Sequence, residues 1–136
     1  DGQIFGSSGP LITVSEQIGD IKVAQAIGVS KMLSGSDVNL QVKVAAASWV
    51  PIDTIKIYVN GVLEETRSVV ANSEQGFEFN FSHDSFVVFE VTGQADALYS
   101  LIAPTLKPMA FTNPVFIDAD NDGQWNAPGL PKIAGE

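Results

Sequence analysis

The sequence has no cysteine, one histidine and only seven basic residues, and each shortage excludes a class of protein. Without cysteine the chain can form neither disulfides nor thiolate metal sites, and it has no cysteine nucleophile. A single histidine, His83, excludes a histidine-rich zinc centre within the chain. The lysines and arginines are scattered singly, so we expect no nucleic-acid partner, because a phosphate backbone requires clustered positive charge.

Long apolar segments are also missing. The longest nearly apolar run, residues 44–52, is far shorter than the ~20 residues that cross a bilayer, so the sequence predicts no membrane span. The chain has 136 residues, of which 45% are hydrophobic, and sixteen acidic residues bring its net charge to −9. These values predict one domain, over residues 1–136. The chain begins at Asp1 without a signal-peptide pattern, so we expect it to be a piece of a larger protein.

Alternation of apolar and polar residues marks most of the predicted strands. Between two of them stands Asn60-Gly61, the strongest signal in the chain for a two-residue hairpin turn. The absence of crossover helices favours antiparallel pairing, and the number of short strands predicts an all-β fold, an antiparallel two-sheet sandwich of immunoglobulin-like type. The predicted strands are residues 11–15, 21–23, 38–44, 55–59, 62–63, 77–81, 87–91 and 114–118.

Two stretches lack this alternation. Residues 29–37 are rich in serine and glycine, which predicts a loop. Residues 93–113 contain prolines, and we expect at most a short helical turn around residues 95–101. A surface loop of this length is normally polar, so its apolar side chains are expected to pack against the sandwich or a neighbouring domain. These side chains are Leu98, Leu101, Ile102, Leu106, Met109 and Phe111.

One motif has the composition of a metal-binding loop. Residues 118–124 read D-x-D-x-D-G-x, the first half of a calcium loop of EF-hand type. Calcium takes six to eight oxygen ligands, and alternate carboxylates on a tight loop can converge on one point. The sequence therefore predicts a structural calcium site whose ligands are Asp118, Asp120, Asp122 and the carbonyl of Gln124.

The second half of the calcium motif is absent. The twelfth position, which should be a bidentate glutamate, is Gly129, and Pro128 precedes it. Asn126 could contribute directly or through water. The expected affinity is therefore weak, on the order of 10⁻⁴ to 10⁻³ M, as in extracellular modules. The alternative is a turn without metal, in which aspartate and asparagine side chains bond to their own backbone.

A second group of residues has the composition of a catalytic triad. Residues 82–85 read Ser-His-Asp-Ser, but neighbours in sequence cannot easily converge as a triad must. We expect these residues to form the turn between two strands. A small hydrolase built on the aspartate cluster also remains an alternative, but it lacks an evident base, nucleophile or oxyanion device.

Five blocks of the sequence, in order, resemble a C-terminal β-domain of bacterial PHP-type (polymerase-and-histidinol-phosphatase) metal-dependent phosphoesterases. The most similar block ends in the aspartate motif, and in the fourth block Phe86 stands where the family often has tryptophan. The blocks are residues 2–5 with 8–12, 44–53, 55–61, 84–88 and 110–123.

The resemblance implies that the chain is a non-catalytic accessory domain. In that family the metal-binding histidines lie in an upstream catalytic barrel, and this chain has no His-x-His. None of the family's catalytic residues can therefore be carried over to it. The expected function is packing on or stabilising the upstream catalytic domain of the same protein, which would be the partner.

The alternative function is an extracellular binding or adhesion module, stabilised by calcium, for a carbohydrate or protein ligand. Such a module requires exposed aromatic side chains in a row, whereas Trp49 and Trp125 stand isolated in the sequence. Both functions are compatible with an extracellular or periplasmic location, given the acidic charge and the lack of cysteine.

Overall fold

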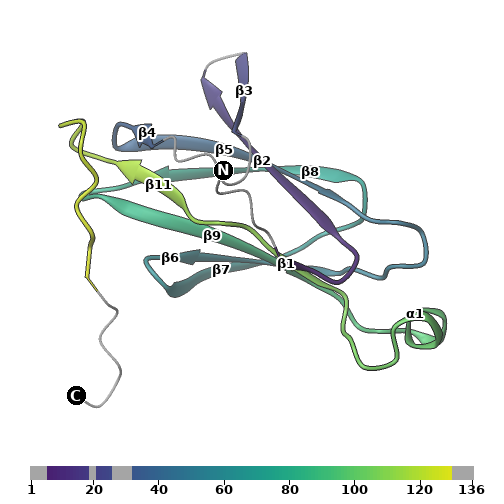
Figure 1. Ribbon diagram of the computed structural model, residues 1–136. Helices are drawn as coiled ribbons and strands as arrows, with labels where there is room; N and C mark the ends of the chain where they lie inside the picture. Colours follow the sequence, from purple (N-terminus) through teal and green to yellow (C-terminus); the bar gives the residue numbers. More distant parts are fainter. Residues whose placement is uncertain (1–5, 19–20, 26–31, 130–136) are drawn as a thin grey trace.

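The computed structural model describes residues 6–18, 21–25 and 32–129. Within these residues the chain forms two β-sheets packed face to face, with one short helix at one end (Figure 1). The elements are β1 (Gly6–Ser7), β2 (Leu11–Ile18), β3 (Ile21–Gln25), β4 (Leu33–Ser34), β5 (Asp37–Ala45), β6 (Thr54–Val59), β7 (Val62–Ser68), β8 (Ser73–Asn80), β9 (Ser85–Thr92), α1 (Ala97–Ile102), β10 (Met109–Phe111) and β11 (Val115–Asp118).

One sheet has the order β3-β2-β5-β8, and all its pairings are antiparallel. In the other sheet β9 is central. It pairs with β6 along one edge, and along the other edge with β11 near its start and β10 near its end. The pairing of β11 with β4 is parallel and is the exception to the predicted antiparallel arrangement. The predicted all-β, immunoglobulin-like sandwich is confirmed.

The core lies between the two inner faces, and its side chains alternate along the strands as the sequence predicts. The rings of Phe77 on β8 and Phe89 on β9 lie 5.3 Å apart between centroids, so they join the two sheets at the centre of the core. The buried residues of β2, β5, β6, β8 and β9 are Ile12, Val14, Val38, Leu40, Val42, Val44, Ile55, Ile57, Phe77, Val87, Phe89 and Val91.

The predicted hairpin joins β6 to β7. Asn60 and Gly61 have φ angles of 51° and 81°, the left-handed values that a type I′ turn requires. The Asn60 side chain also binds the start of β9. Its Oδ1 accepts the N–H of Phe86 at 2.9 Å, and its Nδ2 donates to the hydroxyl of Ser85 at 3.2 Å. The turn therefore fixes the register of three neighbouring strands.

The two irregular stretches differ in part from the sequence predictions. The loop expected over residues 29–37 contains β4, which was not predicted, and residues 29–31 lie outside the described residues. Residues 93–113 contain the expected helical turn, α1, but also β10, which pairs with β9 and β1. Among the described residues, no helix is long and apolar enough to cross a membrane.

The apolar side chains named for residues 93–113 are not buried against the sandwich, and the alternative, packing against a neighbouring domain, stays a prediction. They are between 40% and 81% exposed: Leu98, Leu101, Ile102, Leu106, Met109 and Phe111. Tyr99 is the anchor instead, with no exposed area. A helix of six residues can turn only one face toward the sandwich, and the large aromatic side chain occupies that face.

Candidate metal centre

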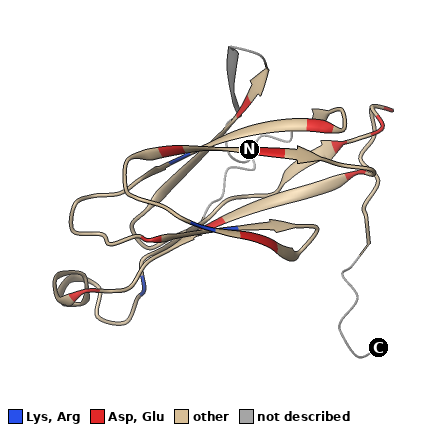
Figure 2. Cartoon of the chain, turned by 180° about the vertical axis from the view of Figure 1, so that it is seen from behind, with Lys and Arg blue, Asp and Glu red and all other residues tan. Residues whose placement is uncertain are grey.

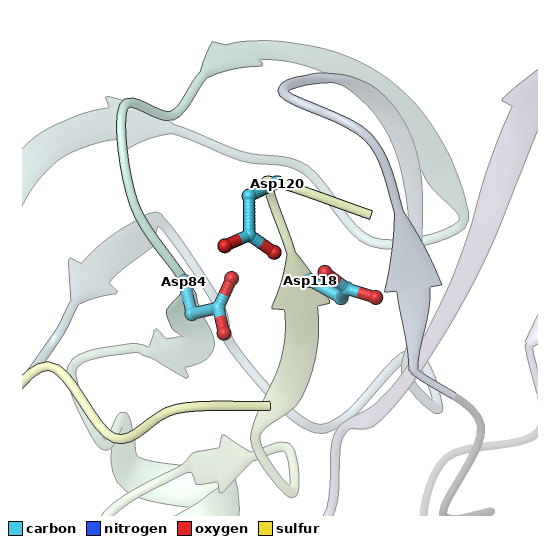
Figure 3. A group of neighbouring side chains, drawn as sticks. All are labelled: Asp84, Asp118 and Asp120. Carbon is cyan, nitrogen blue, oxygen red and sulfur yellow. The ribbon is translucent and has the colours of Figure 1, made fainter. Parts of the chain in front are cut away.

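Three aspartates converge at the end of the sandwich where β9 begins and β11 ends. Asp84 precedes β9, Asp118 is the last residue of β11, and Asp120 follows two residues later. One oxygen from each carboxylate lies within 4.8 Å of the others. Figure 3 shows the carboxylates of Asp84 and Asp120 turned toward each other, with Asp118 beside them. These three residues are a group that could hold a metal ion.

Asp118 is held by the sheet and by the loop that follows it. Its backbone pairs with Ser34 of β4, and its carbonyl accepts the N–H of Gly35 at 2.8 Å. Its carboxylate is fully buried and accepts two backbone N–H groups, from Asp122 at 3.2 Å and from Gly123 at 2.9 Å. The loop therefore closes around this side chain.

Asp84 connects the start of β9 to the segment after β11. Its exposed fraction is 5%. One carboxylate oxygen accepts the N–H of Ala119 at 2.9 Å, and the other accepts the N–H of Asn126 at 2.6 Å. The hydrogen bond from Asn126, with smaller ones from Ala119 and Asp120, lowers the pKa of Asp84 against the opposing effect of burial. The carboxylate is thus held in its charged form.

Asp120 is more exposed than Asp84, and its pKa shifts in the opposite direction. The backbone N–H of Asp122, 3.2 Å from its Oδ1, lowers its pKa. Burial and the carboxylates of Asp118, Asp122 and Asp84 oppose this effect and together raise the pKa of Asp120. The segments that form the cluster, residues 82–86 and 118–126, contain no lysine or arginine. The clustered negative charge therefore has no lysine or arginine of these segments to balance it.

The remaining predicted ligands lie farther along the loop. Asp122 accepts the N–H of Gln124 on its Oδ1 at 2.7 Å and is not among the three grouped carboxylates. Gly123 has a φ of 83°, and nothing lies within 4 Å of where its Cβ would be, so it serves the bend and not a close contact. Side-chain bonds to the loop's own backbone, the alternative to a metal site, are thus also present. The full ligand set of the sequence prediction stays a prediction.

Asp84 was not among the ligands predicted from the sequence. The signal that would have found it is strand order: Ser85 pairs with Ile117, so the residue before β9 must lie beside the residues after β11. Sequence neighbours alone do not give this pairing, because the two strands are about thirty residues apart in the chain.

The Ser-His-Asp sequence does not form a triad. The Ser82 hydroxyl lies 3.1 Å from Nδ1 of His83, but Asp84 is committed to the N–H groups of Ala119 and Asn126. A cleft of about 290 Å³ lies here, and its walls include Ser82, His83, Asp84, Asp120 and Asn126. The aspartate faces the loop after β11, so the histidine has no orienting carboxylate from its neighbour.

Both tryptophans support the irregular segments at the two ends of the sandwich. The Trp125 ring packs edge-on against Phe116 at 4.8 Å between centroids, and its Nε1 donates to the carbonyl of Ser85 at 3.0 Å. The Trp49 ring stacks on Tyr99 at 6.0 Å. Each ring therefore packs on an aromatic neighbour, and the two are not aligned as a platform for a sugar.

No family model matches the chain, and no curated protein matches it. Among solved structures, the chain is similar to the CARDB domain of a protein from Pyrococcus furiosus, a structure described as a complex with di-metal ions. The two are 17% identical, and the match covers 82% of this chain and 96% of that one with a TM-score of 0.37.

The resemblance to PHP-type phosphoesterases is therefore wrong as an assignment, because none of these comparisons gives a link to that family. The physical reason lies in the blocks that suggested it. The two with the clearest pattern, residues 55–61 and 110–123, end a strand in an Asn-Gly turn and an Asp-rich turn. Sandwich geometry itself demands such blocks, so they recur in domains without common ancestry.

Proposed function

We propose that the chain is a non-catalytic β-sandwich module whose closing loop is fixed by a bound divalent cation. The observation that carries the proposal is the convergence of Asp84, Asp118 and Asp120, with oxygens within 4.8 Å and two of the three carboxylates buried. Buried carboxylates gathered in this way repel one another unless a positive charge joins them. All donors are hard oxygens, which suit calcium better than a transition metal.

The cation would act on structure and not on chemistry. It would join the turn before β9 to the loop after β11, where Asp84 already binds the backbone of Ala119 and Asn126. Asp122 and Gln124 could complete the shell by a small movement of the loop. We expect weak affinity, on the order of 10⁻⁴ to 10⁻³ M, which suits the calcium concentration outside cells, and the proposed location is accordingly extracellular or periplasmic.

Thermal unfolding in calcium and in chelator tests this proposal. At ten times its Kd, a ligand that binds only the folded state stabilises it by about 1.4 kcal/mol. For a chain of this size the expected rise in Tm is roughly 4 °C. Magnesium at the same concentration should give a smaller rise, because it demands a tighter octahedral shell.

Two variants with the same net charge separate a bound ion from general screening. Asp120→Asn keeps a hydrogen-bond acceptor but removes one grouped carboxylate, so the calcium response should disappear. Asp53→Asn removes an exposed acid beside β6, away from the cluster, and should leave the response intact. Equal responses of both variants, or none in the wild type, would leave a loop held by its own hydrogen bonds.

A second candidate function is a binding module for a polar ligand such as a carbohydrate. It is favoured by a hollow of about 630 Å³ on the sheet of β2, β5 and β8. Gly76 opens this hollow, because a Cβ there would lie 3.0 Å from the amide of Gln41. Binding of the wild type to a glycan array, with loss in Gly76→Val, would support this function over the first. The walls of the hollow include Gln17, Asn39, Gln41, Arg67 and Glu78.

A further inference from the structure

The segment that joins β9 to β10 presents an apolar surface at the end of the sandwich opposite the aspartate cluster (Figure 1). Leu98, Leu101, Ile102 and Leu106, here called the apolar tip, are 52%, 81%, 54% and 53% exposed. The first three stand at positions i, i+3 and i+4 and share one face of α1. Exposed aliphatic residues usually occur singly on soluble proteins, whereas a contiguous group marks an interaction surface.

The apolar tip is held firmly from behind. Tyr99 is fully buried, its ring stacks on Trp49, and its hydroxyl donates to the carbonyl of Ser8 at 2.7 Å. The Asp96 side chain caps α1 by accepting the N–H of Tyr99 at 2.8 Å. The leucine and isoleucine side chains thus project from an ordered base, which lowers the entropy lost when a partner binds them.

The segment that carries the apolar tip differs in net charge from the rest of the chain. Residues 93–111 contain one acid, Asp96, and one base, Lys107, so their net charge is zero in a chain of −9 (Figure 2). Contact through this neutral segment brings the fewest like charges of two such acidic copies close together. The acid precedes the apolar tip and the base follows it. A two-fold axis through the tip can therefore bring Lys107 of one copy toward the partner's Asp96.

We propose that the chain self-associates through the apolar tip as an isologous two-fold dimer, independently of any cation. In such a contact the face of Leu98, Leu101 and Ile102 packs against the same face of the partner's helix. The helix has only six residues, so the interface is smaller than that of a stable dimer, and association depends on concentration. Insertion into lipid is disfavoured, because surfaces of that kind are rich in lysine and arginine, and this one has a single base.

Sedimentation velocity of the 136-residue chain in chelator tests the proposal without a contribution from the metal site. With concentration raised from the micromolar to the millimolar range, the average mass should rise from 14.4 kDa toward twice that value. Leu101→Asp should stay at the monomer mass at every concentration. Circular dichroism of the variant should match the wild type, because a side chain that is 81% exposed contributes little to the fold.

A matched control and a charge variant decide between the outcomes. Leu63→Asp places the same charge on β7 at a leucine that is 48% exposed, away from α1, and should associate like the wild type. Lys107→Glu removes the base and should weaken association severalfold. A monomeric wild type, or equal loss in both leucine variants, overturns the proposal. So does a monomeric wild type that floats with neutral phosphatidylcholine vesicles, which would make the apolar tip a lipid anchor.

Discussion

The loop after β11 and the segment that carries α1 lie at opposite ends of β9, which extends about 25 Å at ~3.3 Å per residue. Each is irregular, and each is held by a fully buried side chain that binds backbone groups, within the loop at one end and distant in sequence at the other. At the first end Asp118 accepts N–H groups of Asp122 and Gly123, and at the second the Tyr99 hydroxyl donates to Ser8. The anchors are similar, but the exposed chemistry is opposite.

The side chain that anchors a loop and the groups that the loop exposes to a partner are therefore independent of each other. At the aspartate end, the groups left accessible are carboxylates, and they favour a small cation. At the α1 end the accessible groups are aliphatic and the charges cancel, which favours another apolar surface. Substitution of the anchor or of the exposed group at each end tests this difference through the free energy of unfolding.

Tyr99→Ala should have the largest effect on stability. It removes a fully buried ring that stacks on Trp49, and we expect a loss of about 3–5 kcal/mol in the free energy of unfolding, measured in urea. Tyr99→Phe is the control. It removes only the bond to the Ser8 carbonyl and should cost about 1 kcal/mol. Equal losses in the two variants would mean that the ring packing contributes nothing.

Asp118→Ala should come next. It leaves two backbone N–H groups without their buried acceptor, so the expected loss in chelator is about 2–3 kcal/mol by the same urea measurement. Asp122→Ala removes an exposed acceptor for one N–H, that of Gln124, and should cost at most about 1 kcal/mol. The reverse order would show that the loop closes around Asp122 and not around Asp118.

Leu101→Asp should have the smallest effect on the unfolding of the monomer. Exposed substitutions away from caps and core usually stay within about 0.5 kcal/mol, and Leu101 is the most exposed large apolar side chain among the described residues. Urea unfolding at low concentration measures this value. A loss near that of Tyr99→Ala would mean that the apolar tip is part of the base and not a surface for a partner.

The sequence predicted the parts of this fold that depend on neighbouring residues. The hairpin at Asn60-Gly61 and the alternating strand 38–44 follow from local backbone preference and side-chain period, and both are confirmed. Strand β10 was missed because it has only three residues, too few for a period to appear. It forms because β9 and β1 offer it partners on both sides.

The candidate site was predicted only where its residues are close together in the sequence. Asp118 and Asp120 belong to a motif that is visible in a few residues. The third member of the group, Asp84, joins them only because β9 pairs with β11 across a long stretch of chain. The pairing of strands that are distant in sequence depends on the packing of the whole core, so local sequence patterns do not predict it.

The two hydrogen bonds of the Asn60 side chain also bear on how the protein ages. An asparagine before a glycine deamidates when the glycine nitrogen attacks the side-chain amide carbon and closes a five-membered ring. Here the amide is bound on both sides, by the N–H of Phe86 and by the hydroxyl of Ser85, and the attack requires it to leave them. The turn that is chemically the most fragile in the sequence is therefore protected for as long as β9 stays folded beside it.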